Sequence, residues 1–352
     1  MNFSSFFVVL LFVYILILGL YFLYSKNFNN KFTDKRIKIK QKTGKYFLQI
    51  DKKSPEQTDL ISQMFFLISS LNEDAKINKN YLIFDYNMSY PRIFNTDASN
   101  IIRLTDALAQ IMLLNLSNST IIIKFLLSSY HKDQVKFTLS VWANKNFAKD
   151  CKKYEMLHVN MSKKSRKFMR FAKNLAAQND SDIKFDLDSP DSLKVSTDIV
   201  LQLCATKVDI LKEIKLKKTK NFSALIAEDN LYAFNILKKD LEFIGIDVKP
   251  SYDWEIIKRH IEDTIFNPDI VFIQSSMLRF INIDEIQNSL IEKNIPLVII
   301  KNDSDFIAID SKIYAQYLPQ PYTADTLINI LNNAHEYYLQ RNRVKAVAAG
   351  QI

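Results

Sequence analysis

The chain has 352 residues, of which 48% are hydrophobic and 12% aromatic, and its formal net charge is +9. This length and composition predict two globular domains of ordinary size and exclude an intrinsically disordered chain. Only four glycines and two cysteines occur in the sequence, which excludes a glycine-rich phosphate-binding loop and a disulfide framework.

An apolar run opens the chain at residues 6–24 and contains no charged side chain. Its length suits a helix that crosses a bilayer. No basic segment precedes it and no small-residue cleavage pattern follows, so a transmembrane helix within residues 1–25 is favoured over a signal peptide or a buried core helix. Residues 26–45 carry eight lysines and arginines against one aspartate. By the positive-inside rule, we expect a single-pass membrane protein, with its N-terminus outside and the bulk of the chain cytoplasmic.

The basic juxtamembrane segment, residues 26–45, is expected to contact anionic lipids. Nucleic acid is the competing explanation for a basic chain, and a membrane tether argues against it. Further lysines and arginines lie in residues 152–173 and in a basic linker, residues 206–220. These fit solvated surfaces, and the alternative is contact with anionic lipid or an acidic partner.

Residues 46–205 are expected to form the first soluble domain, in which strands and helices alternate with period-two and helical spacing. The helix after the first strand should open at Ser54 or Pro55, and Thr96 or Asp97 should cap the next one. The last two strands look like edge strands. In chain order, the expected elements are a strand at 45–51, helices from 54 and from 97 to 125, strands at 81–91 and 134–144, a helix near 165–179, and strands at 183–188 and 196–204.

Residues 221–340 are expected to form a second domain, and residues 341–352 a flexible tail. Short apolar segments at 222–230, 268–276, 296–302 and 313–321 alternate with helical segments, which predicts a parallel sheet with crossover helices. Ligands bind such sheets at the carboxyl ends of the strands. The polar residues expected at these ends are Glu228, Asp229, Gln274, Lys301 and Gln320.

With these residues in these places, the second domain resembles the receiver domain of bacterial response regulators, a doubly wound, flavodoxin-like sheet of five parallel strands. Glu228 and Asp229 match the family's metal-binding acidic pair. The resemblance puts Gln274 at the phosphoaccepting aspartate, Lys301 at the switch hydroxyl and Gln320 at the lysine that precedes a proline.

Three positions that carry the family's chemistry are therefore changed. A glutamine amide can neither attack a phosphoryl donor nor supply an anionic metal ligand. We expect Lys301 to form an ion pair with Glu228 or Asp229 in place of a metal. The family's partner-binding face would fall at about 310–338. Tyr317 stands near the family's rotating aromatic, or alternatively is an aromatic of the edge strand packed on the last helix.

The first domain resembles the two-layer α/β ATP-binding domain of sensor histidine kinases, most clearly over residues 91–125. Asp97, Leu104 and Gln110 match positions there, and Asn118 falls where a Mg-binding asparagine would be. The family's adenine-binding aspartate and glycines would occupy residues 143–147, and its ATP lid residues 165–168, but neither segment contains a glycine or an aspartate. The first histidine is His131, so the phosphodonor histidine that precedes such a domain is missing.

The resemblance therefore implies a degenerate hybrid sensor kinase of the bacterial inner (cytoplasmic) membrane. Its first domain would be a pseudo-kinase and its second a pseudo-receiver. We expect no catalytic residue, no cofactor and no metal site, with Asn118 and the pair Glu228 and Asp229 as vestiges. The expected function is a non-enzymatic scaffold or adaptor for protein partners in a signalling or envelope-associated assembly, with chemosensory and flagellar assemblies as examples, either as a homo-oligomer or within a larger complex. Two alternatives stay open, namely an active hybrid kinase or phosphorelay protein and a ligand-sensing pseudo-receiver.

Overall fold

The computed structural model describes residues 57–96, 98–147, 160–186, 191–204, 222–250, 254–263, 267–279, 284–301, 309 and 311–348. All of these belong to one compact unit, Pro55–Ile352. They form two lobes, the first within residues 57–204 and the second within residues 222–348. The expected transmembrane helix, juxtamembrane segment, first strand and linker lie outside the described residues. Among the helices that are described, none is both long enough and apolar enough to span a bilayer.

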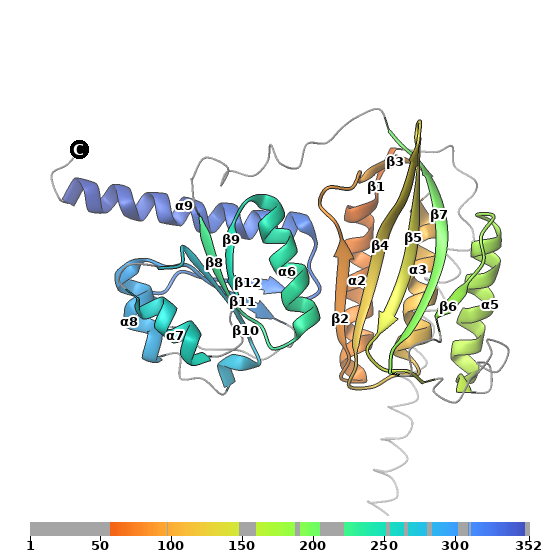
Figure 1. Cartoon of the computed structure of the whole chain (residues 1–352), viewed down its shortest axis with the longest axis horizontal. Helices are drawn as coiled ribbons and strands as arrows, with labels where there is room; N and C mark the ends of the chain where they lie inside the picture. The colour runs from red at the N-terminus through yellow and green to blue at the C-terminus, as the bar shows by residue number, and fades with distance from the viewer. Residues whose placement is uncertain are drawn as a thin grey trace, which may run out of the picture. The chain divides into compact units, whose positions relative to one another are not determined.

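The first lobe is a mixed five-stranded sheet with helices packed on one face (Figure 1). Its strands lie in the order β2-β4-β5-β7-β6. The pair β2 and β4 is parallel, and the other pairs are antiparallel. The strands are β2 (Tyr81–Tyr86), β4 (Thr120–His131), β5 (Gln134–Ala143), β6 (Lys184–Asp186) and β7 (Leu193–Gln202).

Three helices, α2 (Leu60–Ile77), α3 (Ala98–Leu113) and α5 (Lys163–Ala177), pack against this sheet around one hydrophobic core. A two-stranded antiparallel ribbon, β1 (Gln57–Asp59) with β3 (Ile93–Asn95), precedes α2 and α3. The first helix thus begins later than Ser54 or Pro55. Its N-cap is Asp59, whose carboxylate accepts hydrogen bonds from the amides of Ile61 and Ser62 at 3.0 and 3.2 Å.

The helix expected over residues 97–125 is wrong in its second half. It ends at Leu113, and Thr120 already begins β4. The intervening LLNLSNS is rich in Asn and Ser, which favour turns, and the following Thr and Ile residues favour a strand. Asn78 and Asn80 donate side-chain hydrogen bonds to the carbonyls of Leu113 and Leu116, so the orphan carbonyls near the helix end are satisfied.

The second lobe is a parallel five-stranded sheet in the order β12-β11-β10-β8-β9. Helices α6 and α9 pack on one face, and α7 and α8 on the other (Figure 1). This confirms the expected α/β receiver-type sheet. Its elements are β8 (Ser223–Ala227), α6 (Leu231–Ile244), β9 (Asp247–Pro250), α7 (Trp254–Glu262), β10 (Ile270–Gln274), the 3-10 turn η4 (Met277–Arg279), α8 (Asp284–Lys293), β11 (Leu297–Lys301), β12 (Ala315–Pro319) and α9 (Ala324–Ala348).

Two further expectations are corrected. The strand β7 lies between β5 and β6, so it is an interior strand of ten residues and not an edge strand. The C-terminal segment is helical as far as Ala348, where a flexible tail was expected from residue 341. That stretch contains Ala, Lys, Arg and Val but no Pro or Gly before Gly350, so nothing in it stops the helix.

Part of the second face of the first lobe's sheet, near β2, packs against α6 of the second lobe. Alternate residues of β2 point to opposite faces. Phe84 and Tyr86 pack into the helix-side core, whereas Ile83 is buried against Ala233 and Ile236 of α6. An antiparallel sheet commonly leaves one face to solvent, and here that face binds the second lobe.

Candidate functional site

The carboxyl ends of the second lobe's strands bring the predicted site residues to one edge of the sheet. Glu228 follows β8, Gln274 ends β10 and Lys301 ends β11. Gln320 follows β12, and its backbone amide donates a hydrogen bond to the backbone carbonyl of Lys301 at 2.8 Å. The structure therefore gathers at this edge the residues that the sequence placed there.

Glu228 is only 1% exposed. One carboxylate oxygen accepts a hydrogen bond from the Asn230 amide at 3.0 Å. The other accepts one from the hydroxyl of Tyr81, a residue of β2 in the first lobe, at 3.3 Å. The pKa of Glu228 is raised to about 8, chiefly by burial and also by the neighbouring Asp229, against the opposing effect of the hydrogen bonds from Asn230 and Tyr81. The carboxyl is therefore largely protonated at neutral pH, which makes it a poor ligand for a divalent cation.

Gln274 is buried beside Glu228, and its side-chain oxygen accepts a hydrogen bond from the Asp229 amide at 3.2 Å. Burial and then the charge of Glu228 raise the pKa of Tyr81 well above its ordinary value, while a hydrogen bond from Gln274 lowers it. Tyr81, Glu228 and Gln274 thus form one polar cluster. The cluster joins the two lobes, because Tyr81 belongs to β2 of the first lobe and the other two residues to the second.

Lys301 does not form the expected ion pair with Glu228 or Asp229 among the residues that the structure describes. Its ammonium instead lies 5.3 Å from the centre of the Tyr317 ring. Tyr317 pairs with Ile299 across β11 and β12, which makes Lys301 its diagonal neighbour on the same face. Both carboxylate oxygens of Glu228 already accept hydrogen bonds. A cation–π contact therefore replaces the predicted ion pair.

Tyr317 is 44% exposed at the edge strand β12. Gln320 is buried, and its backbone carbonyl accepts a hydrogen bond from the side-chain amide of Asn72 in α2 at 3.1 Å. The loop after β12 is thus tied to the first lobe. Of the expected partner face, residue 310 lies outside the described residues, and residues 311–338 are described.

Further contacts between the lobes surround the start of α6. The Asn230 side chain, which caps α6, donates to the Thr120 hydroxyl at 2.8 Å. The rings of Trp142 and Tyr232 are 4.7 Å apart at their centres. Lys239 of α6 pairs with the buried Asp85 of β2. These contacts hold the edge that carries Glu228 against the first lobe's sheet.

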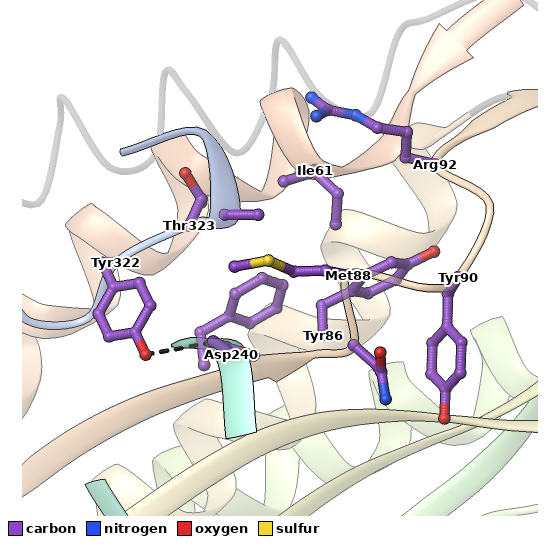
Figure 2. Close-up of a pocket in the computed structure, with 11 residues that line it drawn as sticks. Ile61, Tyr86, Met88, Tyr90, Arg92, Asp240, Tyr322 and Thr323 are labelled. Carbon is purple, nitrogen blue, oxygen red and sulfur yellow. Dashed lines mark hydrogen bonds between the residues drawn. The ribbon is translucent and has the colours of Figure 1, made fainter. Parts of the chain in front are cut away.

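A second group of contacts lies around a small cavity of about 20 Å³ between the lobes (Figure 2). Both terminal nitrogens of Arg92 donate hydrogen bonds to the carboxylate of Asp325 in α9, at 2.6 and 2.7 Å. Its Nε donates a hydrogen bond to the carboxylate of Asp59 at 2.9 Å. Across the cavity, the Tyr322 hydroxyl donates to Asp240 at 3.1 Å, as the dashed line in Figure 2 marks. Burial raises the pKa of Asp240 to about 7. The cavity has room for about one water molecule.

The kinase-type positions of the first lobe have structural partners. Leu104 is a core residue of α3, and Gln110 donates to Asp74 at 2.7 Å. Asn118 lies in the turn after α3 with a φ of 48°, and not on the helix. Its backbone amide donates a hydrogen bond to the backbone carbonyl of Asn78. Asp97 lies outside the described residues.

Residues 144–147 follow β5 where an adenine-binding loop would be. The Asn144 side-chain oxygen accepts from the Thr120 amide at 2.8 Å, and Lys145 donates to the Ser117 carbonyl at 3.0 Å. Beside this loop lies an open hollow of about 570 Å³, lined in part by Asn115, Phe147 and Asp191. Residues 165–168, the expected lid, belong to the first turns of α5. Among the described residues, no cluster of three or more His, Cys, Asp or Glu could hold a metal ion.

Tyr81 and Arg92 were not predicted from the sequence. The burial of Tyr81 could have been inferred from β2, because this strand carries apolar residues on both of its faces. Tyr81 and Ile83 lie on one face, and Phe84 and Tyr86 lie on the other. Two apolar faces indicate burial on both sides. No comparable pattern marks Arg92.

No protein-family model matches the chain, and no curated protein matches it. Among solved structures, full-length ShkA in complex with AMPPNP aligns with a TM-score of 0.57 at 9% identity, over 81% of this chain and 58% of that one. The histidine kinase AdeS of Acinetobacter baumannii aligns with a TM-score of 0.32 at 12% identity, over 41% and 66%. A response regulator receiver protein from Burkholderia phymatum aligns with a TM-score of 0.27 at 18% identity, over 32% and 93%.

The chain spans little more than half the length of ShkA, and at 9% identity this likeness concerns the fold alone. It extends across both lobes, since it covers 81% of the chain. What it establishes is a shared fold: a two-layer α/β lobe followed by a five-stranded parallel sheet with helices on both faces.

Proposed function

We propose that this protein is a non-enzymatic, membrane-anchored scaffold or adaptor of two-component type, built from a degenerate kinase-type lobe and a pseudo-receiver lobe. The observation that carries the proposal is Gln274. It ends β10 at the phosphoacceptor position, and its side-chain oxygen accepts from the Asp229 amide. A neutral amide supplies neither the nucleophile nor the anionic ligand that receiver phosphorylation needs.

The polar cluster around Gln274 supports the same conclusion. Because Tyr81 donates to Glu228, a metal at this edge would have to displace a partly buried aromatic side chain. It would also have to deprotonate a carboxyl whose pKa burial raises to about 8. Both requirements weaken metal binding.

The first lobe supports the proposal through its loop after β5. Asn144 and Lys145 are engaged by Thr120 and Ser117 within the lobe, and residues 143–147 contain no carboxylate that could bind adenine. The loop also lacks glycine, so its backbone has little freedom for a close approach to phosphates.

A scaffold needs fixed surfaces, and the contacts between the lobes supply them. The two lobes are linked by the Arg92–Asp325 ion pair, the Asp85–Lys239 pair and the burial of Ile83 against α6. The candidate partner face in residues 310–338 includes the half-exposed Tyr317. We propose that protein partners bind there, at the inner face of the membrane to which the apolar run at 6–24 tethers the chain.

The enzymatic part of this proposal is tested by radiolabelling. The full-length protein is incubated with γ-labelled ATP and with labelled acetyl phosphate, beside an active hybrid kinase as positive control. We expect no label on the protein. Covalent label at a stoichiometry comparable with the control would overturn the non-enzymatic assignment.

The partner face is tested separately with a photo-crosslinking amino acid at Tyr317 in intact membranes, followed by mass spectrometry. Leu126, an exposed residue of the first lobe, is the matched control because it is 47% exposed against 44% for Tyr317. We expect discrete protein adducts at position 317 only. Equal adduct patterns at both positions would contradict the assignment of this face.

One observation favours the alternative, an active kinase. The hollow of about 570 Å³ beside residues 144–147 lies where a kinase-type lobe would hold nucleotide, and ShkA was solved with AMPPNP. Saturable binding of a fluorescent ATP analogue, abolished by a bulky Ser117→Trp substitution in this hollow, would support that function. Label transfer in the assay above would then be its decisive evidence.

A further inference from the structure

The helix α5 of the first lobe presents an unusually basic outer face. Six lysines and arginines and no acidic residue occur within Lys163–Ala177. All six side chains are exposed, while Ser165, Met169, Ala172, Leu175 and Ala176 are buried against the lobe. The basic residues are Lys163, Lys164, Arg166, Lys167, Arg170 and Lys173.

This arrangement works against the stability of the helix itself. Lys163, Lys164 and Arg166 lie in the first turn, where the helix dipole disfavours positive charge. Lys163 and Lys167 are four residues apart, as are Arg166 and Arg170, and like charges at this spacing repel. None of these five residues forms an ion pair with the part of the chain that the structure describes. These five positive charges are therefore not neutralised by the part of the chain that the structure describes, as is expected of a surface that meets an external anion.

The same face carries an aromatic side chain. Phe171 is 37% exposed between Arg170 and Lys173, while Phe168 packs partly against the core. The exposed face of α5 carries cations around an aromatic ring, and its apolar face is buried against its own lobe. Such a helix is suited to lie on an anionic bilayer, with the ring at the level of the lipid headgroups. A nucleic acid would use the cations but would gain less from a single half-buried ring.

We propose that the outer face of α5 docks on an anionic phospholipid surface and holds the first lobe against the membrane. The occupant is indicated by charge complementarity between the exposed cations of α5 and an anionic headgroup layer, and by the exposed ring of Phe171 among them. The inference rests on the membrane anchor of the proposed function, but not on whether the protein is a scaffold or an enzyme.

The test uses the full-length protein reconstituted in vesicles of phosphatidylcholine alone or with added phosphatidylglycerol, each with brominated acyl chains. A Phe171→Trp variant reports contact with lipid by fluorescence quenching. Phe66→Trp is the matched control, because Phe66 is an aromatic of the same lobe, 74% exposed on α2. Subtraction of the unsubstituted protein removes the signal of the native tryptophans.

We expect quenching at position 171 that requires phosphatidylglycerol, decreases at high salt, and exceeds that at position 66. The triple variant Lys163→Glu, Arg166→Glu, Arg170→Glu should abolish it. Each cation near an anionic surface favours docking about fivefold, so removing three weakens docking on the order of a hundredfold even before the added repulsion. Equal quenching at 66 and 171, or quenching at 171 that is insensitive to phosphatidylglycerol and to the triple variant, would overturn the proposal.

Discussion

Replacing Glu228 by Gln tests the buried edge of the second lobe most sharply. The folded protein raises the pKa of this carboxyl from 4.5 to about 8, chiefly through burial. The folded state therefore holds a proton that the unfolded state releases, and the free energy of unfolding falls as pH rises from about 4.5 through about 8. At about 1.4 kcal/mol per pH unit, this group alone accounts for up to about 5 kcal/mol of that loss.

Glu228→Gln keeps an oxygen that can accept from Asn230 and removes the titration. We expect the wild type to lose stability steeply between about pH 4.5 and about pH 8, and the variant to lose distinctly less. Asp240, with a pKa raised to about 7, contributes a parallel loss, so part of the slope should persist until Asp240→Asn is added.

The assay is urea unfolding of the full-length protein in detergent micelles, with the midpoint measured at several pH values. Glu73→Gln is the control, because the Glu73 side chain is 75% exposed and should leave the slope unchanged. If the wild type and Glu228→Gln show the same pH dependence, the carboxyl is ionised in the folded protein. The account of a protonated, Tyr81-capped site would then be refuted.

Three further predictions concern the contacts between the lobes and the metal site. Tyr81→Phe removes the hydrogen bond to Glu228 and should cost about 1–2 kcal/mol of stability, measured by urea unfolding at neutral pH; no loss would mean that the bond is absent in solution. Arg92→Ala leaves Asp59 and Asp325 without their shared partner and should cost at least about 2 kcal/mol and increase hydrogen exchange at the start of α9, whereas unchanged exchange would contradict the contact. Millimolar Mg²⁺ should change neither the tryptophan fluorescence nor the melting temperature, because Glu228 is capped and Gln274 is neutral; a saturable shift abolished by Asp229→Asn would favour the ligand-sensing alternative.

The sheet of the second lobe could be predicted from the sequence because its signals are local. Four of its five strands are short apolar runs, each ending in or followed by a polar residue at the carboxyl edge: Glu228, Gln274, Lys301 and Gln320. The fifth, β9, has the sequence DVKP, which carries no such signal, and it was not among the expected strand segments. The boundaries of the first lobe were less secure. The segment at 97–125 keeps an apolar character through a change from helix to strand, and only the Asn and Ser residues before Thr120 mark the turn.

The contacts between the lobes could not be predicted, because they join residues far apart in sequence. Tyr81 and Glu228 are separated by 147 positions, and Arg92 and Asp325 by 233. The expected Lys301 ion pair failed for the same reason. The sequence indicates that Glu228 lies near Lys301 at the carboxyl ends of the strands. It does not indicate that the Tyr81 hydroxyl, from the other lobe, donates a hydrogen bond to the Glu228 carboxylate.

The most direct measurement of the central claim is phosphorylation of the full-length protein and of its Gln274→Asp variant by labelled acetyl phosphate, with an active receiver domain as positive control. We predict that neither protein is labelled. Restoring the aspartate leaves Lys301 over the Tyr317 ring, Gln320 in place of a lysine, and Tyr81 on Glu228. A stable acyl phosphate on the wild type would contradict the non-enzymatic proposal. On Gln274→Asp alone, it would contradict the claim that the surrounding residues also close this site.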